Sequence, residues 1–312
     1  MTSTLVITFP LNGDCYKQIE QLHETTDKDV FVAYIVHANV EKKSVYGGQL
    51  MAQSIIAASK TINDIFHCYS FHMNFIGGVV PTKPIYFKVN RTMDGPKFSN
   101  RMVRVYHEAT LLCECSIAFR IDNEKAIFNA HSFPKVPKPH QLDDEYPTVL
   151  RFLQNKNLTA IQRNFLEFAD KRIDNFTIKR PCYPEIYLLV DRQTTVENHY
   201  CWIKPRFTIP SSQTDQKAYI AYISDYCPME TAVKNHLSNG YVCDYAASLN
   251  HLIYFHKSDI NVNDWLLYES SSPIADNGRA LTMGRFWSQD GQLIATIAQE
   301  CLTRSRTAVS KL

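Results

Sequence analysis

The sequence predicts an α+β fold, a tandem of two similar units in each of which an antiparallel sheet wraps a central helix. The first observation is a weak repeat of roughly 120 residues, because two stretches share the order of one helix followed by four strands. The second is a hairpin turn at matching places, Asp94-Gly95 and Asp290-Gly291. The third is a polar segment that separates the two stretches. Each unit leaves an open sheet edge, which joining the two sheets would remove.

The first stretch begins with a helix over residues 50–60. Ala52, Ile55 and Ile56 recur at helical spacing, and Leu50 adds apolar surface beside them, so we expect a helix buried on most sides. Strand-like segments bounded by turns follow at residues 68–75, 85–93, 98–107 and 111–120.

The second stretch begins with a helix over residues 215–226, in which Ala218, Tyr219 and Tyr222 recur at helical spacing. We expect Pro228 to end or kink this helix, because proline lacks the N–H that a helix interior needs. Strand-like segments follow at residues 246–255, 265–272, 279–288 and 293–304.

The segment between the two stretches is predicted to be a crossover linker that packs on the surface. Pro134, Pro137 and Pro139 favour an extended start, and residues 150–168 can form a helix. We therefore predict four parts, with bounds at residues 1–121 for the first unit, 122–180 for the linker, 181–307 for the second unit and 308–312 for a tail.

Composition excludes several classes of protein. The net charge is +2 and no dense basic run occurs, so a nucleic-acid partner is not expected. No apolar run reaches the roughly 18 residues of a membrane span, and none is expected. The nine cysteines are scattered without a Cys-x-x-Cys pair, which favours buried thiols over a zinc site or a disulfide framework. We predict neither a metal nor a cofactor.

The glycines argue against three enzyme classes. The sequence contains no Gly-x-Ser-x-Gly motif, so the nucleophile elbow of an α/β-hydrolase is missing. It also lacks the phosphate loop of ATP-driven enzymes and the Gly-x-Gly-x-x-Gly turn that binds dinucleotides. A serine esterase of that fold, an ATP-driven ligase and a Rossmann dehydrogenase are therefore poor candidates.

The last three residues, Ser310, Lys311 and Leu312, form the address that the peroxisomal import receptor reads. Small and polar residues precede them, which suits an exposed terminus. We expect a protein of the peroxisomal matrix with that receptor as a partner. Residues 1–10 lack a basic start and a long apolar stretch, so no secretory signal is expected.

Six short motifs follow one another outside the linker. They are Val45-Tyr46-Gly47-Gly48-Gln49, Ser70-Phe71-His72, Ala221-Tyr222-Ile223-Ser224-Asp225, Ser248-Leu249-Asn250-His251 with Phe255-His256, Asp264-Trp265-Leu266-Leu267-Tyr268, and Gln289-Asp290-Gly291 through Gln299-Glu300. In this order they resemble the type II acyl-CoA thioesterases, a family of double-hotdog proteins with bacterial members and peroxisomal eukaryotic ones. The resemblance implies an enzyme that hydrolyses an acyl-CoA substrate to a free fatty acid and coenzyme A.

The resemblance also implies a catalytic set, carried over by motif as Asp225, Ser248 and Gln299. In the family, three such residues hold a water against the thioester carbonyl. An aspartate can accept the proton of that water, while a hydroxyl and a carboxamide can orient it by hydrogen bonds. Asp225 is expected near the end of a buried helix, where desolvation and the helix dipole both raise its proton affinity.

The sequence departs from the family pattern at several positions. Ser248 stands where the family often has threonine, and Asn250 where it usually has aspartate. Cys227-Pro228 replaces a more apolar continuation of the helix. The first helix carries Gln53 but no carboxylate, and Tyr69 stands near the place that corresponds to Ser248. We therefore expect the first unit to be catalytically silent, with one site per chain.

Three histidines lie on or beside the predicted strands, and two other functions are possible for this sequence. His72, His251 and His256 are interpreted as core or rim residues outside the catalytic set. One alternative is a non-catalytic acyl-CoA binder or regulatory paralogue, which the substitution at Asn250 keeps open. Another is a hotdog enoyl-CoA hydratase, although no Asn-Pro dipeptide of its signature occurs. Association into a homo-oligomer is left open.

Overall fold

The computed structural model describes residues 19–34, 45–78, 83–121, 129–170, 176–181, 183, 187–188, 198–238, 241, 243 and 245–305. The strands are β1 (Leu22–Glu24), β2 (Val30–Ala33), β3 (His67–Phe75), β4 (Ile85–Asp94), β5 (Phe98–His107), β6 (Thr110–Arg120), β7 (Phe176–Lys179), β8 (His199–Pro205), β9 (Tyr245–Phe255), β10 (Leu266–Asp276), β11 (Arg279–Ser288) and β12 (Leu293–Arg304). The helices are α2 (Gly47–Ser59), α3 (Glu145–Leu153), α4 (Ala160–Asp170), α6 (Gln213–Ser224) and α7 (Pro228–Ser238), with a short 3₁₀ turn η1 (Pro139–Gln141).

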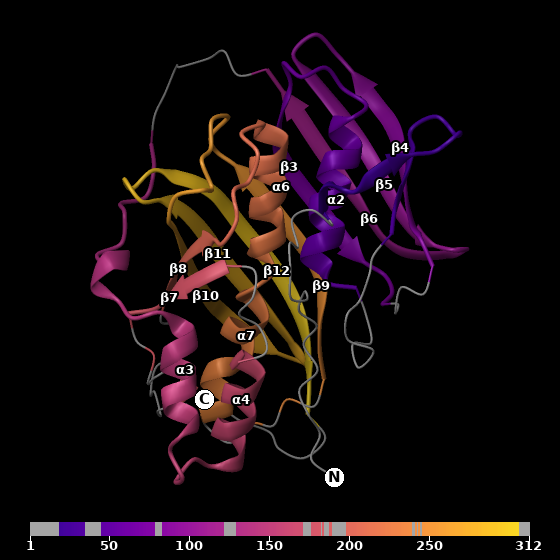
Figure 1. Ribbon diagram of the computed structural model, residues 1–312. Coiled ribbons are helices and arrows are strands. Elements are labelled where there is room, and N and C mark those ends of the chain that lie inside the picture. The colour runs from indigo at the N-terminus through magenta and orange to yellow at the C-terminus, as the bar shows by residue number, and fades with distance from the viewer. Residues whose placement is uncertain are drawn as a thin grey trace.

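The strands form one antiparallel sheet in the order β1-β2-β4-β5-β6-β3-β9-β12-β11-β10-β8-β7 (Figure 1). The first six strands, taken inwards from one edge of the sheet, follow the same order as the last six taken inwards from the other edge. In this correspondence β3 matches β9 and β6 matches β12. The repeat seen in the sequence is therefore present in the topology. β3 pairs with β9 from Ser70↔Tyr254 to Asn74↔Asn250, so the two inner edges are joined as expected. The bounds of the two units stay a prediction.

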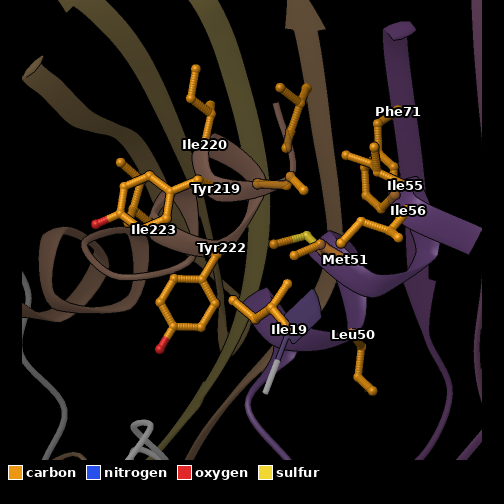
Figure 2. Packing of buried hydrophobic residues seen from close by; sticks show 14 of the residues in the cluster. Ile19, Leu50, Met51, Ile55, Ile56, Phe71, Tyr219, Ile220, Tyr222 and Ile223 are labelled. Atoms are coloured by element: carbon orange, nitrogen blue, oxygen red, sulfur yellow. The ribbon is translucent and has the colours of Figure 1, made fainter. Parts of the chain in front are cut away.

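The helices α2 and α6 lie side by side against the sheet and pack on each other (Figure 1). Both were predicted from helical spacing, and both begin and end within three residues of the expected positions. Figure 2 shows Met51 of α2 pointing towards α6 and Ile55 beside Phe71 of β3. These residues share one apolar cluster with Tyr219 and Ile220 of α6. Helices that are apolar on most sides are stable only when buried in this way.

The prediction for Pro228 is wrong. α6 ends at Ser224, with Asp225 as its C-cap, three residues before the proline. Pro228 is instead the first residue of α7, a helix that the sequence analysis did not predict. A proline fits the first helical position because the N–H it lacks has no intrahelical partner there. α7 packs on β9 to β12.

The linker also differs from its prediction. In place of one helix over residues 150–168 there are two, α3 and α4. The break has a local cause: Thr159 and Gln162 form a capping box, in which each backbone N–H donates to the other's side-chain oxygen. The linker is not merely a surface layer, because Val149, Phe165 and Leu166 are buried in a second apolar cluster with Val233 of α7.

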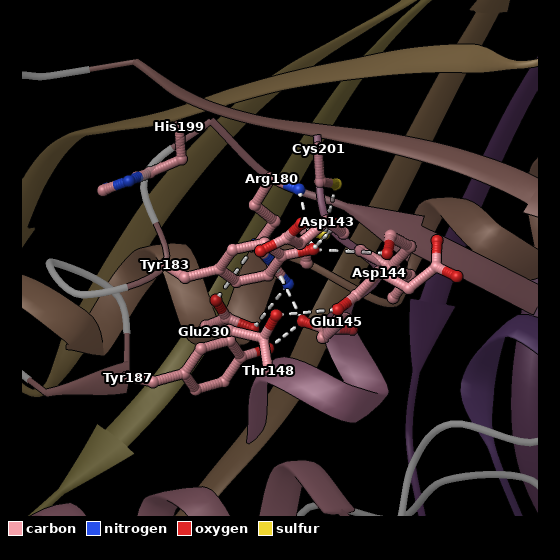
Figure 3. A network of polar contacts seen from close by, with 12 residues as sticks. Asp143, Asp144, Glu145, Thr148, Arg180, Tyr183, Tyr187, His199, Cys201 and Glu230 are labelled. Atoms are coloured by element: carbon pink, nitrogen blue, oxygen red, sulfur yellow. Dashed lines mark hydrogen bonds and ion pairs between the residues drawn. The ribbon is translucent and has the colours of Figure 1, made fainter. Parts of the chain in front are cut away.

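A buried ion network fastens the linker to the second unit (Figure 3). Arg180 donates from Nε to Glu145 Oε1 of α3 at 2.9 Å, and its NH1 lies 3.3 Å from Glu230 Oε1 of α7. The Arg180 and Glu145 side chains are almost fully buried, and that of Glu230 is only 6% exposed. The pair of carboxylates raises the pKa of the Arg180 guanidinium against the opposing effect of burial. The Arg180 guanidinium therefore joins α3 to α7.

Two further expectations concern thiols and membranes. The seven described cysteines are free and buried, as predicted; Cys15 and Cys182 lie outside the described residues. Among the helices that the structure describes, none combines the length and apolar character needed to cross a bilayer.

Candidate active site

The structure brings Asp225, Ser248 and Gln299 together. Ser248 Oγ donates to Asp225 Oδ1 at 3.3 Å, and Gln299 Nε2 donates to Ser248 Oγ at 2.9 Å. Asp225 caps the C-terminus of α6, while the other two side chains come from the neighbouring strands β9 and β12. Gln299 is fully buried and Asp225 is half-buried.

A β-bulge sets the direction of the Ser248 side chain. The pairing of β9 with β12 changes between Asn250↔Glu300 and Ser248↔Cys301, so Leu249 is an extra residue on β9. Side chains alternate along a regular strand, which would put residues three apart on opposite faces. The bulge instead places Ser248 on the same face as His251, the residue that pairs with Gln299.

The first unit reaches the site through the N-terminus of α2. Gly48 N–H donates to Asp225 Oδ2 at 3.1 Å, so this carboxylate takes the capping role that the N-cap residue Tyr46 does not fill. Tyr46 Oη donates to the Tyr222 carbonyl at 2.9 Å. The contact between units explains the glycine pair of the motif: a Cβ on Gly48 would lie 2.3 Å from the Tyr222 oxygen. The first unit therefore gives a backbone N–H to the site, and the prediction that it is catalytically silent applies to its side chains.

The surroundings of Asp225 control its protonation. Burial raises the pKa of its carboxyl group to about 7, while hydrogen bonds with Gln299, Ser248 and the Gly48 N–H oppose the rise. The N-terminus of α2 also points its positive end at this carboxylate. A carboxylate whose pKa is near neutral pH can both accept and release a proton, as a general base requires.

His251 belongs to the same cluster, although the sequence analysis set it aside. Its Nε2 lies 2.8 Å from Ser224 Oγ, and its Nδ1 contacts Gln299 Oε1. The side chain is fully buried, and burial lowers the pKa of its imidazole to about 4. The prediction of a core histidine is consistent with this burial, but its place beside Gln299 was not predicted, because it depends on the pairing of β9 with β12 and no local pattern gives that register.

The departure at Asn250 is accommodated by its neighbour on β12. Asn250 Nδ2 donates to Glu300 Oε2 at 3.3 Å, and the Glu300 N–H donates to Asn250 Oδ1 at 3.2 Å. An aspartate at this position would place two carboxylates in contact, which is unfavourable.

Two other predicted features have separate outcomes. The departure at Cys227 places its Sγ 3.5 Å from Cys201 Sγ of β8. Ser310, Lys311 and Leu312 lie outside the described residues.

A cleft of about 570 Å³ lies elsewhere, beside the loop after β9 and the β11–β12 turn. Asp259 and Ile260 of its lining bond Gln213, at the opposite end of α6 from Asp225. A helix of this length spans roughly 18 Å, so the cleft is separate from the catalytic candidates. Among the described residues, no group of three or more His, Cys, Asp or Glu side chains could hold a metal ion.

Comparison with known proteins matches both halves of the chain. Residues 37–120 match the acyl-CoA thioesterase N-terminal domain family, and residues 168–303 match the acyl-CoA thioesterase C-terminal domain family. Rat acyl-coenzyme A thioesterase 8 is 31% identical over 268 residues, covering 86% of this chain and 82% of that protein. The peroxisomal acyl-coenzyme A thioester hydrolase 1 of Saccharomyces cerevisiae is 24% identical, covering 86% of this chain and 88% of its own.

Among solved structures, acyl-CoA thioesterase II TesB2 from Mycobacterium marinum superimposes with a TM-score of 0.73 at 24% identity, covering 94% of this chain and 99% of its own. This likeness confirms the double-hotdog fold that the sequence predicts. The chain belongs to the type II acyl-CoA thioesterase family, and it is accordingly a thioester hydrolase.

Proposed function

We propose that this protein hydrolyses fatty acyl-CoA to a free fatty acid and coenzyme A with a water held by Asp225, Ser248 and Gln299. One observation carries the proposal: the half-buried carboxylate of Asp225 is hydrogen-bonded to the Ser248 hydroxyl, which in turn accepts a hydrogen bond from Gln299. The pKa of Asp225, raised by burial to about 7, makes it a stronger base than an ordinary carboxylate.

The chemistry needs one proton acceptor and one attacking water. Ionised Asp225 takes a proton from the water as the water oxygen forms a bond to the thioester carbonyl carbon. The tetrahedral intermediate then collapses, the C–S bond breaks, and Asp225 returns the proton to the departing coenzyme A thiolate. Ser248 and Gln299 hold the water in line with the carbonyl and so reduce the entropic cost of its attack.

The place of this reaction is proposed to be the peroxisome, as part of its lipid metabolism. The terminal residues Ser310, Lys311 and Leu312 support import, and a yeast relative carries the word peroxisomal in its name. Fusing a fluorescent protein to the N-terminus should give punctate peroxisomal signal. Removing the three terminal residues should disperse it, and an unchanged punctate pattern would contradict the proposal.

The activity is tested with a series of acyl-CoAs of short, medium, long and branched chains, by following thiol release. Asp225→Asn should lower kcat by about 10² to 10⁴-fold while the fold persists. Asp259→Asn, which changes an exposed carboxylate at the separate cleft, should retain wild-type turnover. Wild-type turnover in Asp225→Asn would reject the mechanism. Tight acyl-CoA binding without thiol release would select the non-catalytic alternative.

A further inference from the structure

The catalytic candidates form part of a longer series of hydrogen bonds that closes back on α6. Ser224 Oγ lies 2.8 Å from His251 Nε2, His251 Nδ1 contacts Gln299 Oε1, and Gln299 Nε2 donates to Ser248 Oγ at 2.9 Å. Ser248 Oγ then donates to Asp225 Oδ1 at 3.3 Å. Ser224 and Asp225 are neighbours in the chain, so the series is a ring.

When Asp225 is ionised, only one placement of the hydrogens satisfies the part of this ring that runs from His251 to Asp225. A carboxylate only accepts, so the Ser248 hydroxyl must donate to it and can only accept from Gln299. Gln299 therefore presents its N–H to Ser248 and its carbonyl oxygen to His251. That oxygen also only accepts, so His251 Nδ1 must carry a hydrogen.

The state of His251 follows from the same reasoning. Burial lowers the pKa of its imidazole to about 4, so the ring is neutral at neutral pH and carries a single N–H. With that hydrogen on Nδ1, Nε2 only accepts, and it competes with the Ala221 carbonyl, 2.8 Å from Ser224 Oγ, for the one hydrogen of the Ser224 hydroxyl. From His251 onwards, every donor then points the same way, through Gln299 and Ser248 to Asp225.

We propose that His251 is a positioning residue that fixes the carboxamide of Gln299 in one of its two orientations, and so aligns Ser248 with Asp225. This inference rests on the proposed function. A carboxamide has nearly the same shape when its oxygen and nitrogen are exchanged, so its hydrogen bonds set its orientation. Nε2 faces Ser248, Asp225 and Cys301 Sγ, and His251 is the partner of Oε1. With the imidazole absent, Gln299 can turn its oxygen to Ser248, whose hydroxyl would then donate to Gln299 instead of Asp225.

Substitution at His251 separates this role from core filling. His251→Leu fills the space but removes the donor, so kcat should fall on the order of 10- to 100-fold, as when the outer partner of a functional group is lost. KM should stay within about twofold, because the buried ring does not reach substrate. His251→Asn is a poorer core residue but keeps an N–H at the δ position, and its kcat should exceed that of His251→Leu by about threefold or more.

Matched variants isolate the route through Gln299. His256→Leu removes the exposed histidine that follows β9, whose Nε2 lies 2.8 Å from Thr296 Oγ1, and should leave kcat within about twofold. Adding His251→Leu to Gln299→Ala should cost no further activity, because the two residues act as one unit. Full activity in His251→Leu, or no recovery in a folded His251→Asn, would overturn the proposal.

The tautomer of His251 can be read without turnover. Nitrogen-15 NMR of the wild-type imidazoles at about pH 9, where Asp225 is ionised, should show a neutral ring with hydrogen on Nδ1 and none on Nε2, assigned by the signal lost in His251→Asn. A ring with hydrogen on Nε2, or a charged ring, at that pH contradicts the inference. This measurement decides the positioning role even if the wild type releases no thiol, an outcome that would reject only the proposed function.

Discussion

At the scale of single residues, Asp225 is placed where its charge is costly and useful at once. Its pKa is raised to about 7 by burial, so at neutral pH the reactive carboxylate is only partly formed. We expect kcat to rise with pH and to level off above about 7, whereas an unperturbed carboxyl group would give a constant rate from about pH 5 upwards. Steady-state assays from pH 4 to pH 9 check this.

The same shift predicts how stability depends on pH. Since the pKa of Asp225 is raised above its unfolded value, the folded protein binds more protons between about pH 4 and pH 7, and raising the pH through that interval costs stability. Asp225→Asn removes this cost. Its Tm relative to wild type should therefore increase as the pH rises from 4 to 8. A difference in Tm that does not change with pH would show that Asp225 is not perturbed.

At the scale of elements, the site depends on how closely α2 approaches α6. A Cβ at Gly48 would lie 2.3 Å from the backbone oxygen of Tyr222, which cannot rotate away. We expect Gly48→Ala to cost about 1–3 kcal/mol of unfolding free energy and to lower kcat, because the Gly48 N–H moves away from Asp225. Gly77→Ala is the control, since its added Cβ would meet only the Leu111 oxygen, at 3.7 Å. Equal urea midpoints for the two variants would contradict this.

The linker helices give a second prediction at this scale. Arg180→Leu removes the guanidinium that lies between the buried carboxylates of Glu145 and Glu230, so we expect a loss of about 3–5 kcal/mol. Arg91→Leu breaks the exposed pair with Asp29 and should cost less than about 1 kcal/mol. Urea unfolding of both variants measures the difference, and similar losses would mean that the buried network does not hold α3 to α7.

At the scale of the whole molecule, the two halves share one sheet and one core. β3 pairs with β9, and the main apolar cluster takes residues from α2, α6 and strands of both halves. We therefore expect a single cooperative unfolding transition, with equal calorimetric and van't Hoff enthalpies. Two resolved transitions in calorimetry would show instead that the halves unfold independently.

The sequence by itself determined the features that depend on near neighbours in the chain. The helical spacing of α2 and α6, the turns at Asp94-Gly95 and Asp290-Gly291 and most strand bounds follow from periods of a few residues. The repeat of element order, with the motifs, was enough to indicate the family and to select Asp225, Ser248 and Gln299 as candidates.

Only the tertiary structure decided the contacts between distant segments. The Gly48 N–H meets a carboxylate 177 residues away. The register of β9 on β12 pairs His251 with Gln299, and a bulge at Leu249 brings Ser248 to the same face. The apolar side of the linker packs in one cluster with α7, a helix that lies far from it in the sequence. Such contacts depend on strand register and helix approach, which follow from the free energy of the whole core and leave no local pattern in the chain.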